Sequence, residues 1–278
     1  MVSTHDSLTT TLTARRADTK AILTIGDQPT EAIRALSDAG LLRCPECDGA
    51  VILKAGAVRL HHFAHLAACT NGHGEAETDS HRAGKWALYD HFRLKSTLAA
   101  LEWRLGEQRA DVYIEAAAEG TVGRFALEFQ QANNSAAEWD TRHAGYRALG
   151  VTDCWFLGQV RYGERRGEAL RPISPYDPIP TPREGFEAAA GAFALREMER
   201  AILTSQLAAG DLPRLVYLDP DDAMLTILLP RDLMAATLRA YRYRLPLTAC
   251  HLTSGGLWTP LDNALEGYRI YAQKHRHF

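Results

Sequence analysis

Residues 125–130 read FALEFQ, and the alternation of their side chains is the pattern that decides the fold. Successive side chains of a strand point to opposite faces, so this segment predicts a strand with Glu128 and Gln130 on one face and apolar residues on the other. The earlier segment 110–116, ADVYIEA, predicts a second strand, which carries Asp111. If the two strands are neighbours, the carboxyl groups of Asp111 and Glu128 meet on one face.

The segments around these two strands have the lengths and periodicities of regular elements. Trp86, Tyr89 and Phe92 recur at helical spacing after Thr78, a residue type that caps helices. Alternation and turn residues give the rest of the order. The predicted elements are a helix at 78–94, strands at 100–105, 110–116 and 124–131, a helix at 135–149 and a strand at 152–157. This order, α-β-β-β-α-β, predicts an α/β fold.

A group of cysteine and histidine residues precedes this core. Cys44 and Cys47 form a C-x2-C motif, and His65 and Cys69 follow at a spacing that is typical of zinc ligands. We predict that these four residues bind a structural zinc ion, with His62 as the alternative ligand for one of them. A closed four-ligand site holds a small lobe together and performs no chemistry. The other interpretation is a pair of buried thiols beside surface histidines.

The remaining segments indicate how the chain is divided. Around the cysteine and histidine residues we expect a strand at 21–25, a helix at 30–39, and a hairpin of strands at 51–53 and 57–60. The five prolines of 171–183 argue against regular structure and mark a linker. Beyond the linker we expect a helix at 184–208 and strands at 215–218 and 224–229. The predicted division is a flexible lead-in at 1–20, a zinc-binding N-terminal lobe at 21–75, the α/β core at 76–170, a Pro-rich linker at 171–183, and a C-terminal α+β domain of unknown role at 184–278.

The bulk composition excludes several classes of protein. The chain has 278 residues, of which 46% are hydrophobic and 23% charged, as in an ordinary globular protein. No apolar run is long enough to span a bilayer, so we expect no membrane insertion. Three of the five cysteines cluster, which favours a metal site in a reducing, cytoplasmic environment over disulfides. The net charge of −3 gives no general attraction for nucleic acid, so DNA binding would use a local patch.

The polar residues of the predicted core have the chemistry of a metal-dependent site. Two carboxylates that converge in a cleft, here Asp111 and Glu128, bind Mg²⁺ or Mn²⁺, because these ions prefer oxygen ligands. His81 and Lys85 lie four residues apart on the predicted helix, so they project from one side of it. A lysine there would offset negative charge near a scissile phosphate, and a histidine would orient a phosphate or a water molecule. The alternative is that all four are solvent-facing side chains of an ordinary helix and sheet.

In this order and spacing, the motifs resemble the competence protein CoiA-like nuclease family, which is related to the restriction-endonuclease-like superfamily with a PD-(D/E)xK core. The resemblance covers residues 42–158 and rests on CPEC, HFAH, Cys69, Glu77, His81-x-x-x-Lys85, ADV at 110–112, ALEFQ at 126–130, Arg142 with Gly145-Tyr146, and WFLG at 155–158. It implies a restriction-endonuclease-like core in which Asp111 and Glu128 bind the catalytic metal. It also implies that Glu77, His81 and Lys85 belong to an active-site helix.

One position departs from the pattern of the superfamily. Gln130 stands where a lysine is usual, and a neutral amide cannot supply a positive charge. We expect Lys85 to supply that charge from the helix. Arg142 and Tyr146 share a face of the following helix, where they would either contact the DNA backbone or serve as helix surface and core aromatic.

The function implied by the resemblance is that of a metal-dependent deoxyribonuclease, with a structural zinc ion and a catalytic Mg²⁺ or Mn²⁺ ion. Its main partner would be DNA, and recombination or DNA-uptake proteins would be further partners. It would act in DNA uptake and recombination during competence, or in defence against foreign DNA. Two alternatives remain open at the level of sequence. One is a catalytically inactive, zinc-containing DNA-binding factor, and the other is an adaptor that recruits a recombinase through residues 184–278.

Overall fold

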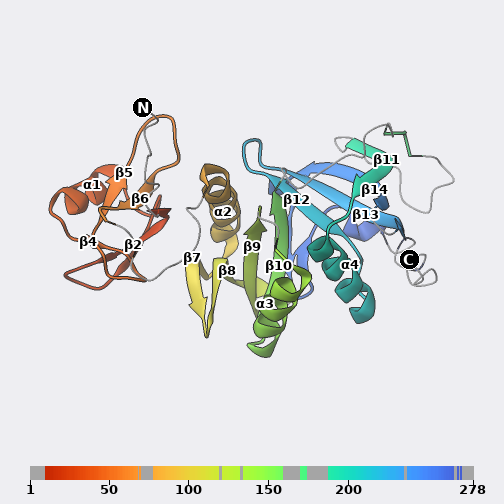
Figure 1. The fold of residues 1–278 in the computed structure, drawn as a ribbon, viewed down its shortest axis with the longest axis horizontal. Coiled ribbons are helices and arrows are strands. Elements are labelled where there is room, and N and C mark those ends of the chain that lie inside the picture. The colour runs from red at the N-terminus through yellow and green to blue at the C-terminus, as the bar shows by residue number, and fades with distance from the viewer. Residues whose placement is uncertain are drawn as a thin grey trace.

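One eight-stranded sheet forms the centre of this mixed α/β protein (Figure 1). The computed structural model describes residues 10–67, 69, 78–118, 121–131, 134–158, 170–173, 187–234, 237–265, 268 and 270. From one edge of the sheet to the other, the strands are β11 (Glu187–Ala194), β14 (Thr237–Pro246), β13 (Met224–Met234), β12 (Leu215–Asp219), β10 (Thr152–Gly158), β9 (Thr121–Gln130), β8 (Gln108–Ala118) and β7 (Leu98–Leu105). Strand β10 runs parallel to both of its neighbours, and the other pairings are antiparallel.

Two helices pack on opposite faces of the β7–β10 part of this sheet. Helix α2 (Asp79–Phe92) begins at Thr78, whose hydroxyl accepts a hydrogen bond from the backbone N–H of His81, and Ser135 caps α3 (Ala136–Ala148) in the same way. The apolar side of α2 packs on the face that carries Leu127 and Phe129, whereas α3 packs on the face that carries Ala126. Because successive strand residues alternate between faces, Glu128 belongs to the α3 side. The observed order α2-β7-β8-β9-α3-β10 matches the predicted order of elements.

The N-terminal lobe consists of one helix and two small sheets. Its elements are β1 (Thr10–Thr11), β2 (Thr13–Arg16), β3 (Ile22–Thr24), α1 (Thr30–Asp38), β4 (Leu42–Arg43), β5 (Val51–Lys54) and β6 (His62–His65). The sheets have the orders β1-β6-β5 and β3-β2-β4. In Figure 1 the lobe lies beyond the β7 edge of the large sheet.

Two features of this lobe differ from our expectations. We predicted a flexible lead-in at 1–20, whereas residues 10–16 form strands, because Leu12 and Ala14 are fully buried and the neighbouring threonines favour strands. We also predicted that 57–60 would pair with 51–53. The structure instead pairs β5 with β6, so that Val51 lies opposite His65.

The C-terminal half continues the large sheet instead of forming a sheet of its own. Leu157 of β10 pairs with Tyr217 of β12, so residues on both sides of the Pro-rich segment share one sheet. We predicted one helix over 184–208, whereas the structure has β11 followed by α4 (Glu197–Ala209). The segment EAAAGAFA of β11 has high helix propensity, but its pairing with β14 and the burial of Phe193 outweigh it. Most of the predicted linker, 174–183, lies outside the described residues.

The described residues further include a small hairpin and short 3-10 helices. Strands β15 (His251–Thr253) and β16 (Gly256–Trp258) form the hairpin. The 3-10 helices are at Arg93–Lys95, Leu247–Ala249 and Asp262–Ala264. Among the described helices, none combines the length and the apolar character needed to cross a bilayer.

Candidate active site

The structure brings Asp111 and Glu128 together across two neighbouring strands. Val112 of β8 pairs with Leu127 of β9, so that Asp111 lies opposite Glu128 one position further along. One carboxylate oxygen of Asp111 accepts a hydrogen bond of 2.9 Å from the backbone N–H of Phe129. The side chain of Asp111 is 19% exposed and that of Glu128 only 1%, so the pair opens to solvent on the Asp111 side.

The two carboxyl groups have opposite electrostatic surroundings. Burial, and next the negative charge of Asp111, raise the pKa of Glu128 to about 8. Burial also opposes the ionisation of Asp111, but the hydrogen bond and charge of His81, together with the charge of Lys85, hold the pKa of Asp111 well below its ordinary value. The site therefore contains one acid that is ionised at neutral pH and one that takes up a proton easily.

Helix α3 supplies two partners for the buried acid. The Arg142 guanidinium lies 2.5 Å from a carboxylate oxygen of Glu128, and the Tyr146 hydroxyl donates to the same oxygen. Arg142 also donates to the carbonyl oxygen of Arg109 at 3.1 Å and lies over the ring of Trp155 at 5.6 Å. The structure thus places Arg142 and Tyr146 against the candidate metal ligand.

Helix α2 brings His81 and Lys85 to the other side of the acids. The Nε2 atom of His81 lies 3.4 Å from Asp111, and the His81 ring stacks on Phe129. The ammonium group of Lys85 donates to Glu102 of β7 at 2.8 Å, and both side chains are almost completely buried. Glu102 was not among the residues that we singled out. A single acid in a strand is common, and its pairing with Lys85 is visible only after the helix is packed on the sheet.

The two remaining candidate residues of the core are Gln130 and Glu77. The amide of Gln130 donates to Asn134 at 3.0 Å and lies at the end of β9. One of its partners is therefore a residue of the following loop. Glu77 lies outside the described residues.

The cysteine and histidine residues of the N-terminal lobe form a compact group of metal-ligating atoms. The sulfur atoms of Cys44 and Cys47 and a ring nitrogen of His65 all lie within 4.8 Å of one another. Burial raises the pKa of Cys44 to about 11. Burial acts in the same sense on Cys47, but hydrogen bonds from the Gly49 backbone and then from His65 and Cys69 lower its pKa to about 7. Thiolate and imidazole ligands fit zinc, and a metal such as zinc could bind here.

Cys69, the fourth predicted zinc ligand, and His62, the alternative for one of the four, have different positions relative to this group. Cys69 contacts Cys47, since it is one of the groups that lower the Cys47 pKa. His62 lies on β6 three residues before His65, so the two rings leave the strand on opposite faces. The His62 ring contacts the carbonyl oxygen of Leu60 at 2.9 Å, and burial lowers its pKa. The structure does not bring His62 into the Cys44–Cys47–His65 group.

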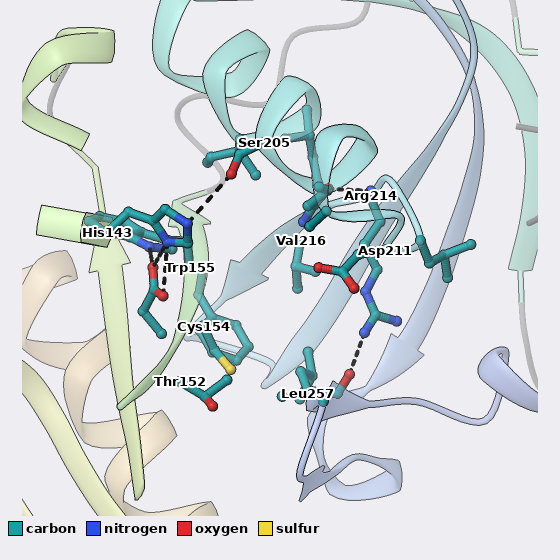
Figure 2. Close-up of a pocket in the computed structure, with 18 of the residues that line it drawn as sticks. His143, Thr152, Cys154, Trp155, Ser205, Asp211, Arg214, Val216 and Leu257 are labelled. Atoms are coloured by element: carbon teal, nitrogen blue, oxygen red, sulfur yellow. Dashed lines mark hydrogen bonds and ion pairs between the residues drawn. The ribbon is translucent and has the colours of Figure 1, made fainter. Parts of the chain in front are cut away.

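A cavity of about 640 Å³ lies between α3, β10, α4 and the β15–β16 hairpin (Figure 2). Within it, Nδ1 of His143 lies 2.8 Å from Asp153, and Nε2 lies 3.5 Å from the hydroxyl of Ser205. These are the residue types of a nucleophilic triad, but Ser205 lies inside α4, where the helix itself uses the backbone N–H groups that would stabilise an oxyanion. His143 also stacks on Trp139, so we interpret the three residues as a polar contact that joins α3, β10 and α4.

The cavity is separate from the paired acids. In the part of the chain that the structure describes, neither Asp111 nor Glu128 lines it. The two regions are connected through Trp155, which lines the cavity, lies under Arg142 and pairs with Glu128 in the sheet. The paired carboxylates therefore form a site at β8 and β9 that is distinct from this cavity.

Comparison with known families gives two matches that follow one another along the chain. Residues 25–71 match the model described as competence protein CoiA, N-terminal domain, and residues 77–174 match the one described as competence protein CoiA, nuclease-like domain. The two matches are consecutive and together span about half of the chain. The chain belongs to the competence protein CoiA family, and its core is nuclease-like. The search of curated proteins and the search of solved structures each found no match.

Proposed function

We propose that this protein is a metal-dependent deoxyribonuclease with a restriction-endonuclease-like core, in which Asp111 and Glu128 together hold Mg²⁺ or Mn²⁺. The observation that carries the proposal is the opposition of these two acids across β8 and β9. Asp111 is partly exposed, so that a phosphate group has access to one side of the pair. Two carboxylates on opposed strand positions provide the oxygen ligands that these ions prefer.

The surrounding residues fit roles in phosphodiester hydrolysis. A bound divalent ion would polarise a phosphate oxygen and lower the pKa of a bound water molecule. Asp111 is ionised at neutral pH and is therefore ready to bind a cation. His81, with a side chain 28% exposed, is placed to orient a phosphate or water beside Asp111. Lys85 supplies positive charge near Asp111 in place of the lysine that Gln130 replaces.

The proposed biological setting follows from the family. A nuclease-like domain of a competence family implies DNA as the substrate, and we propose that the protein acts with recombination or DNA-uptake proteins, or in defence against foreign DNA. The described cysteines form no disulfide with one another, and we propose a cytoplasmic location. The Cys44–Cys47–His65 group, with Cys69, would hold a structural zinc ion.

A second candidate function is DNA binding without cleavage. The specific observation in its favour is that both Arg142 and Tyr146 contact one carboxylate oxygen of Glu128, and Arg142 competes with a metal ion for it. If the protein is catalytically inactive, these contacts persist. It should then bind DNA in gel-shift assays and leave the DNA intact with every divalent ion.

Cleavage assays with isosteric variants distinguish the two functions. We expect the wild-type protein to cut single-stranded or duplex DNA with Mg²⁺ or Mn²⁺, and Asp111→Asn and Glu128→Gln to reduce the rate by at least about a hundredfold, because each loses a negative ligand. Glu115→Gln is the matched control, since Glu115 lies on the same strand and shares the Asp111 side of it. Equal activity of the wild-type protein and both site variants would exclude the proposed site.

A further inference from the structure

Glu102 completes a row of three acids across neighbouring strands. Leu101 pairs with Val112, and Trp103 pairs with Ala110, so that Glu102 of β7 lies across from Asp111 of β8. On its other side, Asp111 lies across from Glu128 of β9. The row places Glu102 at the edge of the site proposed above.

The backbone at Glu102 has a conformation that side chains rarely adopt. Its φ angle is +55°, which lies in the left-handed region, and the regular pairing of β7 with β8 is interrupted at this residue. A non-glycine residue keeps such a conformation when its surroundings hold it there. The contacts of the Glu102 side chain stabilise this backbone conformation.

Both carboxylate oxygens of Glu102 are already bound. One accepts the 2.8 Å hydrogen bond from Lys85, and the other accepts from the hydroxyl groups of Thr13, at 2.9 Å, and Thr11. A metal ligand needs an oxygen that is directed at the ion. The Glu102 carboxylate therefore does not fit the role of a third ligand beside Asp111 and Glu128. The contacts fit a residue that holds Lys85 in place.

The two threonines connect Glu102 to the N-terminal lobe. Thr11 belongs to β1, which pairs with β6, the strand that carries His65 of the metal-ligating group. Leu12, between the threonines, is fully buried in the same core as α2. A second contact fastens the lobe to β7, because Glu46 of the CPEC segment pairs with Arg104.

We propose that Glu102 is a positioning residue of the active site, which holds the ammonium group of Lys85 beside Asp111 and is itself held by Thr11 and Thr13 of the N-terminal lobe. This inference rests on the proposed nuclease function. Glu102 acts through Lys85 and does not touch the substrate. The N-terminal lobe thereby contributes to the geometry of the site although its metal-ligating residues are distant from the acids in sequence.

A double-mutant cycle on Lys85 and Glu102 tests this role. We expect Lys85→Met and Glu102→Ala each to lower kcat about tenfold or more with little change in KM, because misplacement of one catalytic group affects the transition state. In the double variant, kcat should equal that of Lys85→Met alone, since Glu102 has no further effect once Lys85 is absent. Glu102→Gln should retain more activity than Glu102→Ala, because its amide oxygen still accepts a hydrogen bond from Lys85. Thermal unfolding of each variant identifies those that fail to fold. The double variant Lys85→Met with Glu102→Gln removes both charges of the buried pair, so that no unpaired charge is left in the protein interior.

A measurement on Lys85 itself does not depend on catalysis. Lys85 should react slowly with an amine-acylating reagent in the wild-type protein and at least several-fold faster in Glu102→Ala and in Thr11→Val with Thr13→Val, as followed by mass spectrometry of its peptide. Thr226→Val is the matched control, because Thr226 is also a buried strand threonine but lies in β13.

The outcomes separate this inference from the proposed function. A wild-type protein that cuts DNA, combined with additive losses in the cycle, would overturn the role of Glu102 and leave the nuclease assignment intact. Unchanged protection of Lys85 in Glu102→Ala would overturn it as well. A wild-type protein that cuts no DNA under any divalent ion would refute both.

Discussion

Arg142 of α3 and Glu128 of β9 form a close ion pair at the centre of the candidate site, with a nitrogen–oxygen distance of 2.5 Å. The carboxylate is 1% exposed and the guanidinium side chain 32%, so the pair is buried on one side and reaches solvent on the other. Burial disfavours the charged form of Glu128, and the arginine compensates for part of this effect. Under the proposed function, this arginine would have to move away from the Glu128 carboxylate, or share it, for a metal ion to bind there.

Removing the arginine should therefore destabilise the protein. We expect Arg142→Met to lower the free energy of unfolding by about 2–3 kcal/mol, less than for a fully buried pair, because the arginine is partly exposed. Arg147→Met, at an exposed position five residues later on α3, should change it by no more than about 0.5 kcal/mol. Urea unfolding of the metal-free protein measures both. Equal stability of the two variants would show that the pair contributes little.

The close packing of α2 on β9 gives a second prediction. A Cβ atom at Gly84 would overlap the ring of Phe129, whose backbone N–H holds Asp111. Gly84→Ala should therefore destabilise the protein by about 1–3 kcal/mol through overpacking and also reduce cleavage. Gly56→Ala is the control, since nothing lies within 4 Å of a Cβ atom there. Thermal unfolding and cleavage assays measure both effects. Equal stability and equal cleavage rates of Gly84→Ala and Gly56→Ala would contradict the close packing of α2 on β9.

The Lys85–Glu102 pair predicts how stability depends on pH. Burial alone would raise the pKa of Glu102, but the charges of Lys85 and Arg109 and the hydrogen bonds lower it from 4.5 to about 2. Because the pKa is lower in the folded state, the stabilisation is fully present above about pH 4.5 and is lost as the pH falls towards 2. The difference in unfolding free energy between the wild-type protein and Glu102→Gln should shrink across this window. A difference that stays constant from pH 5 to pH 2.5 would contradict the assignment.

The metal-ligating group of the N-terminal lobe predicts zinc in the purified protein. We expect about one zinc ion per chain by elemental analysis, and Cys47→Ser to lose it, because the thiolate is a direct ligand. Chelation should lower the unfolding temperature of the wild-type protein, since metal binding stabilises only the folded lobe. Cys154→Ala is the control, because Cys154 is buried in the large sheet away from the group. Zinc retained by Cys47→Ser at the wild-type level would exclude the site.

The core elements could be predicted from the sequence because their patterns are strong and local. The alternation in FALEFQ gave β9 and the face of Glu128, and the helical spacing of Trp86, Tyr89 and Phe92 gave α2. The family assignment followed from short motifs in a fixed order and is confirmed by the family matches. The predicted roles of the site residues stay predictions.

Other features depend on contacts between distant segments and had no local signal. The alanine-rich β11 has the composition of a helix and is a strand because β14 lies beside it. The threonines at 10–13 resemble a polar tail and become strands because β6 and the core bury Leu12. Glu102 is similar, since its partners Lys85 and Thr13 are separated from it by 17 and 89 residues.

The most direct test of the account is a crystal structure of the protein with Mn²⁺, in which anomalous scattering locates the ion. We predict one Mn²⁺ ion between Asp111 and Glu128, about 2.1–2.3 Å from an oxygen of each carboxylate, with Arg142 moved away from or sharing Glu128. Anomalous density that is absent from this position at saturating Mn²⁺, or that contacts neither carboxylate, would contradict the central claim that these two acids share a metal ion.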